Sequence, residues 1–457
     1  MRLFGWHWLA VSSLLAGSLS VYAETRPQYG GTLHVTMRAA PVSLDPADSS
    51  QPESFAQRSL TMLIFDTMLS TDEDGRTQPA LATSWQASQG NRRWQFHLRS
   101  GVKFHDGSAL TAEAAAASLR SANPSWNVSA DGDVVVIEED TPDPELPAEL
   151  ALPRNAIEKQ SPDNKLSGTG PFHIVDWQPR KKLTLGAEED CWRGRPFLDG
   201  VEIEMGKNSQ DQLIELELGK ADLVEVAPEQ SHRVAAEGHL LTSSAPMELL
   251  ALIFTRDVAS PDDKLLRDAL ALSVERGSIR SVLLQGAGQA AASILPNWIS
   301  GYGFVFPTDA DLTRARQARE QVHTIPRWTI GYDADDPAAR LLAERLALNA
   351  RDAGLSLQPT TSTAVDVRLA RIPLASADPW IALANVTAIA GLPGLKNTGR
   401  SVEDLYAAEQ ADLATQRVIP LFHLPASYAA TPVLKNWILR PDGTWSVADA
   451  WLGSAKP

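Results

Sequence analysis

The sequence contains few of the residues and motifs that would indicate catalysis or metal binding. It contains a single cysteine, Cys191, so no disulfide can form within the chain. No histidine pair has metal-ligand spacing, and neither a serine nucleophile elbow nor a glycine-rich phosphate loop is present. His105 and Asp106 are adjacent, but neighbouring residues of a hairpin point to opposite faces, and Asp106-Gly107 is typical of a turn. The sequence therefore predicts no catalytic residue, no metal site, no cofactor and no enzymatic activity.

Positive charge is also scarce. The chain has 41 Lys and Arg against 56 Asp and Glu, a formal net charge of -15. Nucleic acid and anionic lipid surfaces attract basic proteins, so neither is expected as a partner. Cys191 has no identifiable basic neighbour that would activate it, and beside Trp192 we expect a half-buried structural thiol.

Long apolar runs are missing except near the N-terminus. Arg2 precedes an apolar run over 9–19 and the tripeptide Val21-Tyr22-Ala23, which is typical of a secretory signal peptide. The run is about half the length that a membrane-spanning helix needs. We predict a signal peptide over 1–23, cleavage after Ala23 and a periplasmic location. Because Cys191 lies far from this site, a lipid-anchored form is not expected.

What is present predicts a mixed α/β protein. The chain of 457 residues is long enough for two or three compact units, and 30 prolines and 29 glycines indicate many turns. In the first half we expect a helix over 54–69, capped by Ser54 or Glu53, and a second helix beginning at Thr111. In the second half, a strand over 328–332, a helix from Asp336 to Gly354 and a strand over 365–369 predict a βαβ unit. Further expected elements are strands over 32–37 and 134–137, a hairpin joining 94–98 to 102–104, and a helix capped by Asp262 or Asp263.

Several segments, in order, resemble the family 5 extracellular solute-binding proteins, which include oligopeptide, dipeptide and nickel receptors of ABC importers. The similar segments are Gly30-Gly31-Thr32-Leu33, Ser43-Leu44-Asp45-Pro46, PALATSWQAS (79–88), FHLRSGVKFHDGSALTAE (96–113), Gly168-Thr169-Gly170-Pro171-Phe172, Trp192 to Asp199, 265–284 and 418–422. The resemblance covers most of 30–284 and becomes sparse after it.

The resemblance implies a two-lobed, class II-like periplasmic binding protein with mixed sheets and a ligand cleft between the lobes. Lobe I would comprise 24–254, with an accessory subdomain at about 55–165, and lobe II would comprise 255–425. Residues 426–457 would return to lobe I. We expect the chain to cross between the lobes near 250–255 and again near 421–427.

The resemblance also implies where a ligand would lie: against the segment after Ser43, the first crossing strand, and a lobe II loop over 371–380. Peptide receptors of the family carry an aspartate three residues before an acid-proline pair, where it accepts the ligand's ammonium group. If Asp378-Pro379 is that pair, the position is Ala375, and the usual way of holding a peptide is lost. The expected ligand-binding residues are Ser49, Ser50, Phe254, Arg256, Trp298, Arg371, Pro373, Asp378 and Trp380.

Two kinds of residue in this set have alternative explanations. Arg371 shares strand parity with Val367 and Leu369, which favours a position facing the interior or the cleft, where it would bind a ligand carboxylate. Alternatively, it is a strand-end residue whose charge reaches solvent or meets a structural acid. If it clamps a ligand, Arg371→Ala would weaken an anion while leaving the melting temperature of the empty protein nearly unchanged. Trp298 and Trp380 would either stack on a ligand or fill the core.

The function that the resemblance implies is the substrate-binding component of an ABC importer. The protein, a monomer, would capture a short peptide by hinge closure and present it to an inner-membrane permease. Alternatives are the same fold with a non-peptide or anionic ligand, such as an opine, a metal chelate or a haem-like compound, a sensor or chaperone of this fold, or a secreted hydrolase without a local motif.

Overall fold

The computed structural model describes residues 26–51, 54–72, 75–88, 90–161, 163, 165–304, 306–393 and 399–453. The predicted signal peptide lies outside these residues. Within the described part of the chain, no helix is both long and apolar enough to cross a membrane.

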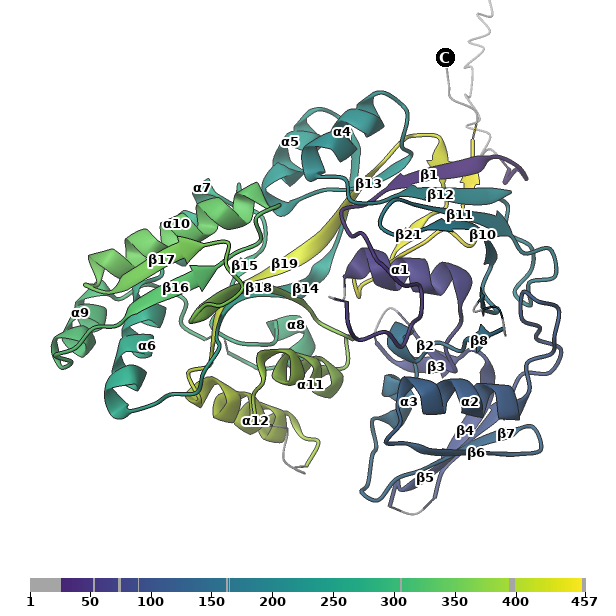
Figure 1. The fold of residues 1–457 in the computed structure, drawn as a ribbon, viewed down its shortest axis with the longest axis horizontal. Helices are drawn as coiled ribbons and strands as arrows, with labels where there is room; N and C mark the ends of the chain where they lie inside the picture. Colours follow the sequence, from purple (N-terminus) through teal and green to yellow (C-terminus); the bar gives the residue numbers. More distant parts are fainter. Residues whose placement is uncertain are drawn as a thin grey trace, which may run out of the picture.

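One large mixed sheet runs through the molecule (Figure 1). Ten of its strands follow the order β10-β11-β12-β1-β13-β19-β14-β18-β16-β17, and β15 pairs with β19 beside this path. Their bounds are β10 Phe172–Gln178, β11 Lys182–Ala187, β12 Gly200–Glu204, β1 Thr32–Thr36, β13 Leu223–Glu225, β19 Val418–Ala430, β14 Leu240–Phe254, β18 Val367–Pro373, β16 Arg327–Gly331, β17 Ser356–Thr360 and β15 Gln289–Ala290.

The two long strands β14 and β19 join the halves of this sheet. At one end β19 pairs with β13 of lobe I, and at the other end β14 pairs with β18 of lobe II. The β14–β19 register shifts between Ser243 and Glu248 and again between Leu250 and Ala251. The first crossing, which the sequence predicts at 250–255, overlaps the end of β14. The apolar run after Glu248 is buried and pairs with β18 as well as with β19.

The accessory subdomain is a four-stranded sheet covered by α2 (Ala112–Ala122), and Thr111 caps this helix as predicted. The predicted hairpin between 94–98 and 102–104 is wrong. The strand β5 pairs with β4 and β7, while Lys103 makes only an isolated bridge to Ala109. The strands of this sheet are β4 Ala82–Ala87, β5 Arg93–Leu98, β6 Asn127–Asp131 and β7 Val134–Glu138.

Shorter elements complete lobe I. The helix α1 begins after Ser54, one of the two predicted caps, and ends at Ile64, before the predicted end at 69. Its Ser59 hydroxyl accepts from the backbone N–H of the buried Trp445, so the C-terminal segment packs on lobe I. These elements are α1 Phe55–Ile64, β2 Leu69–Thr71, β3 Thr77–Pro79, α3 Leu146–Glu149, η1 Pro153–Asn155, β8 Lys159–Gln160, β9 Leu166–Ser167, α4 Ser209–Glu217, η2 Pro228–Gln230, α5 Ser231–Ala236, β20 Leu434–Lys435, β21 Ile438–Leu439, β22 Trp445–Ser446 and β23 Trp451–Leu452.

In lobe II, helices cover both faces of the sheet (Figure 1). Leu250, Leu252 and Phe254 of β14 face α6, α9 and α10, whereas Leu249 and Ala251 face α8, α11 and α12. Asp336 caps α10 as predicted, but Ser260, not Asp262 or Asp263, caps α6. The bounds are α6 Pro261–Ser273, α7 Arg276–Val282, α8 Asn297–Ser300, α9 Leu312–Glu320, α10 Pro337–Asp352, α11 Pro379–Ala390 and α12 Val402–Ala414.

Candidate interlobe binding site

The loop after β18 contacts lobe I directly. The buried Arg58 of α1 donates from Nη1 to the carbonyl oxygen of Leu374 at 2.8 Å. Ala375 is 5% exposed and clusters with Ala148 and Leu152 of the accessory subdomain and Ile381 of α11. The position where the resemblance places an ammonium-binding aspartate is therefore an apolar contact between the lobes. A carboxylate there would be buried among aliphatic side chains, which is costly.

Pro373, Asp378 and Trp380 all have structural roles at this loop. The Asp378 carboxylate caps α11 by accepting from the backbone N–H groups of Trp380 and Ile381 at 2.9 and 3.0 Å. Trp380 is 7% exposed, and the Arg400 guanidinium lies 4.6 Å from the centre of its ring. The carbonyl of Pro373 accepts from the Asn385 amide. Trp380 therefore fills the core in this structure, which was the alternative to stacking on a ligand.

Arg371 meets a structural acid. Its Nε and Nη2 both donate to Oε2 of Glu248, which is 7% exposed, and the Nε distance is 2.8 Å. Burial lowers the pKa of Arg371, but the charge and hydrogen bonds of Glu248 outweigh burial, and the pKa lies above its usual value. Because Arg371 is paired with Leu250, it lies on the α10 side of the sheet, away from α11 and Trp380.

Charged residues from both lobes surround this pair. Arg38, which follows β1, donates from Nη1 to Asp336 at 3.1 Å and also pairs with Asp333. Its backbone N–H donates to Glu225 of β13. Burial raises the pKa values of Glu225 and Glu229. We call this set the hinge charge cluster: Arg38, Arg371, Glu225, Glu229, Glu248, Asp333 and Asp336.

The hinge charge cluster holds two guanidinium groups and five carboxyl groups, so acids are in excess. A ligand carboxylate at Arg371 would have to displace Glu248 and approach the remaining acids, which is electrostatically unfavourable. The anionic clamp that was one explanation for Arg371 is therefore disfavoured. The sequence signalled only part of this cluster, namely Asp336 as a cap and the strand parity of Arg371. The partners of both come from segments distant in the chain.

Exposed aromatic surface lies beside the first crossing. The indole Nε1 of Trp298 donates to the carbonyl of Pro246, inside the irregular stretch of β14, and 42% of the residue is exposed. Phe304 is 47% exposed, and its ring stacks on that of the buried Tyr302 with an interplanar angle of 7°. Trp298 can therefore contact a ligand from this place. The sequence analysis missed Phe304, because an aromatic residue in a Gly-rich loop carries no periodic signal.

Ser49 and Ser50 lie in an exposed loop whose polar groups bond mainly to one another. The Ser50 backbone N–H donates to Asp48, and hydrogen bonds from the Ser50 hydroxyl and backbone lower the pKa of that carboxyl. Between the preceding segment, 41–46, and α1 is a hollow of about 30 Å³, with space for little more than water. It is lined by Pro41, Ser43, Leu44, Asp45, Pro46, Gln57, Leu60, Thr61 and Ile64.

Phe254 and Arg256 lie at the lobe II end of β14. Phe254 is 2% exposed in the lobe II core, against Trp328 and 4.1 Å from the Arg267 guanidinium. Arg256 follows β14, and 84% of its side chain is exposed. Phe254 therefore faces the core in this structure, and a ligand contact by Arg256 stays a prediction.

Most of the chain matches the model of one known protein family. The model of the bacterial extracellular solute-binding proteins, family 5, matches residues 76–374, more than half of the chain. The chain belongs to this family.

Relatives of this chain are named for different ligands. The nickel-binding protein NikA of Staphylococcus aureus is 26% identical over 251 residues, 50% of this chain and 49% of the relative. Heme-binding protein A of Haemophilus influenzae is 24% identical over 337 residues, 63% of this chain and 61% of the relative. The alignments thus span about half to three fifths of these relatives.

Solved structures of family 5 members share the fold. NikA from Staphylococcus aureus, in complex with Ni(L-His)2, superimposes with a TM-score of 0.77 at 19% identity, covering 90% of this chain and 97% of that one. A dipeptide-binding protein from Pseudoalteromonas, in complex with Met-Leu, gives a TM-score of 0.79 at 17% identity, with 92% and 100% covered. The predicted two-lobed α/β fold is therefore confirmed.

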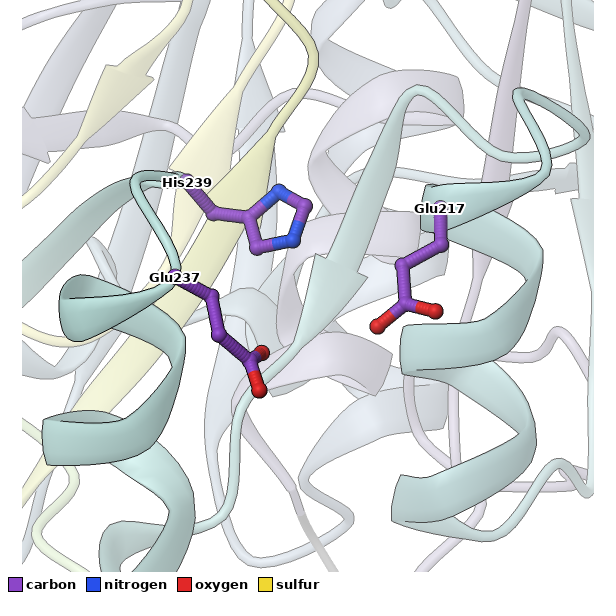
Figure 2. A group of neighbouring side chains, drawn as sticks. All are labelled: Glu217, Glu237 and His239. Carbon is purple, nitrogen blue, oxygen red and sulfur yellow. The ribbon is translucent and has the colours of Figure 1, made fainter.

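One group of possible metal ligands lies apart from the interlobe region. Figure 2 shows Glu217, at the end of α4, facing Glu237 and His239, which follow α5. One ligand atom from each lies within 4.8 Å of the others, and both carboxylates belong to exposed residues. Glu237 already pairs with Arg233 at 2.7 Å, so this group is explained as part of a solvated surface.

Proposed function

We propose that this family 5 protein is the substrate-binding component of an ABC importer, acting outside the inner membrane and delivering its ligand to a permease. The two crossing strands within one sheet carry this proposal. They give the lobes a shared pivot, so the lobes can close on a molecule between them. A ligand drives closure only through contacts that it makes better in the closed form, so it has to touch both lobes.

The proposed ligand class is a short peptide, held with help from the aromatic surface at Trp298 and Phe304. Both rings are partly exposed next to the crossing, where a ligand can reach lobe I and lobe II together. Aromatic rings contribute large contact areas at a small cost in conformational entropy. The peptide amine would not be bound at Ala375, because that residue is covered by the accessory subdomain.

A second candidate is a non-peptide ligand in the same place, such as a metal chelate, a haem-like compound or an opine. The apolar contact at Ala375 favours this second candidate, because a ligand without an ammonium group needs no carboxylate partner at that position. Arg371 does not favour an anion, because Glu248 already occupies it.

Native mass spectrometry of the protein purified from its own host tests the function and separates the candidates. We expect an additional mass that disappears on denaturation, and its composition identifies a peptide, a chelate or another compound. Trp298→Ala should lower the bound fraction, whereas Tyr29→Ala, at another exposed aromatic residue, should not.

Thermal shifts with dipeptides, nickel-histidine, haem and opines provide the independent measurement. A ligand present at 100 times its dissociation constant stabilises the protein by about 2.7 kcal/mol. No co-purifying mass and no shift with any class would contradict the binding function, and turnover of generic ester or peptide substrates would support the hydrolase alternative.

A further inference from the structure

An arginine of lobe I is bound to the first turn of a lobe II helix. Arg38 follows β1, and its guanidinium pairs with Asp336, the cap of α10, and with Asp333 just before it. The two Asp336 oxygens have different partners. Oδ1 accepts from the backbone N–H groups of Ala338 and Ala339, while Oδ2 accepts from Arg38. The contact therefore joins the ordered start of α10 to the end of a central strand.

Both ends of this contact are held by regular structure. On the lobe I side, the Arg38 backbone N–H donates to Glu225, which lies on β13 next to β1 in the sheet. On the lobe II side, capping fixes the carboxylate of Asp336, whose side chain is 10% exposed. An exposed ion pair is weak partly because two long side chains have to be ordered. Here capping already orders the Asp336 carboxylate, so a smaller loss of side-chain entropy offsets the attraction between Arg38 and Asp336.

Arg38 also offsets like charges across the lobe boundary. Glu229 of lobe I lies near enough to Asp336 of lobe II for the two charges to repel, and Arg371 and, to a smaller extent, Arg38 oppose that repulsion. Arg371 is itself paired with Glu248. Loss of Arg38 would thus remove an attraction between the lobes and leave Arg371 as the remaining guanidinium that opposes the repulsion.

We propose that Arg38 is an interlobe clasp. It favours the arrangement of the lobes seen here, in which lobe I contacts the loop after β18, over a more open one, and thereby raises the apparent ligand affinity without touching the ligand. The part concerning affinity rests on the proposed function. The part concerning closure does not, because it applies to the protein without ligand. Arg38 is in this sense a positioning residue for both lobes.

Electron paramagnetic resonance distance measurements on the ligand-free full chain test this clasp. Spin labels would be attached through Glu113→Cys on α2 and Gln317→Cys on α9, two exposed residues, with Cys191→Ser removing the native thiol. In the Arg38→Ala protein at low salt, we expect the ratio of closed to open distances to fall about fivefold, as for an ion pair of ordinary strength. High salt should lower the ratio in the parent protein and change it little in Arg38→Ala.

Matched variants separate the clasp from a general loss of structure. Arg38→Lys keeps the charge and should retain most of the closed population. Asp336→Asn keeps the cap, because asparagine also caps helices. It should open the lobes less than Arg38→Ala does, because Asp333 still pairs with Arg38. Arg340→Ala removes an exposed ion pair with Glu344 within α10 and should have no effect. The clasp is refuted if Arg38→Ala and Asp336→Asn, with unchanged circular dichroism, give the parent distances, or if Arg340→Ala opens the lobes equally.

Discussion

Replacing Arg371 should destabilise the empty protein, because Glu248 would then be buried without its partner. Glu248 is 7% exposed and its Oε2 accepts both hydrogen bonds from Arg371. Breaking a fully buried ion pair costs about 3–5 kcal/mol, and an exposed pair contributes about 0–1 kcal/mol. The Arg371 side chain is 37% exposed and that of Glu248 is 10% exposed. We therefore expect Arg371→Met to lower the unfolding free energy by about 2 kcal/mol, a value between these limits.

Urea unfolding followed by tryptophan fluorescence measures this effect, since the chain has 13 tryptophans. Glu248→Gln and the double variant complete a cycle, in which we expect a coupling of at least about 1 kcal/mol. Arg368→Met, at an exposed residue of the same strand, is the control and should change stability by less than about 0.5 kcal/mol. If Arg371→Met leaves the empty protein as stable as the control does, the pair is not structural, and the ligand clamp expected from the sequence would be restored.

Three further predictions concern buried groups. Burial lowers the pKa of His423 to about 4, whereas in the unfolded chain it is about 6.5, so protonation of the unfolded state should remove about 3 kcal/mol of stability as the pH falls from 6.5 to 4. His423→Gln should flatten that part of a pH–stability curve, and an unchanged slope would contradict the assignment. Glu409 is fully buried and accepts from the backbone N–H groups of Ile294 and Leu295, so calorimetry should show a loss of about 2–3 kcal/mol for Glu409→Ala and little loss for Glu409→Gln, whose oxygen can still accept. Burial raises the pKa of Cys191, so a thiol reagent should react with it only after denaturation, and fast labelling of the native protein would refute this.

Local patterns in the sequence were sufficient for many elements of the fold. Thr111 and Asp336 were predicted as helix caps from short-range chemistry alone, and both cap their helices in the structure. The predicted strand 102–104 is wrong, because the backbone N–H of Phe104 donates to the carbonyl of Ser108 and closes a local turn instead of pairing with β5. The alternation of apolar and polar residues gave no sign that the backbone would be satisfied by this local hydrogen bond.

The candidate site was less accessible to sequence reasoning, because its contacts join distant segments. The strand parity of Arg371 was predicted correctly, yet its partner Glu248 lies on another strand and only the pairing register brings them together. Likewise, nothing near Ala375 in the sequence shows that Ala148 would cover it. Phe254 was predicted to contact the ligand as part of the first crossing strand, but its ring packs against Trp328 in the core.

The position of β19 between β13 and β14 also determines the order in which the molecule can be completed. Glu225 of β13 is paired with Tyr428 of β19. β13 therefore cannot form this pairing until nearly the whole polypeptide has been synthesised. Such remote pairings slow folding, because a large loop has to close before any hydrogen bond compensates for the lost entropy. Until β19 arrives, β13 and β14 each keep an unpaired edge, which is an aggregation risk for the nascent polypeptide. Lobe I, although it begins first, can therefore be finished only after all of lobe II has been made.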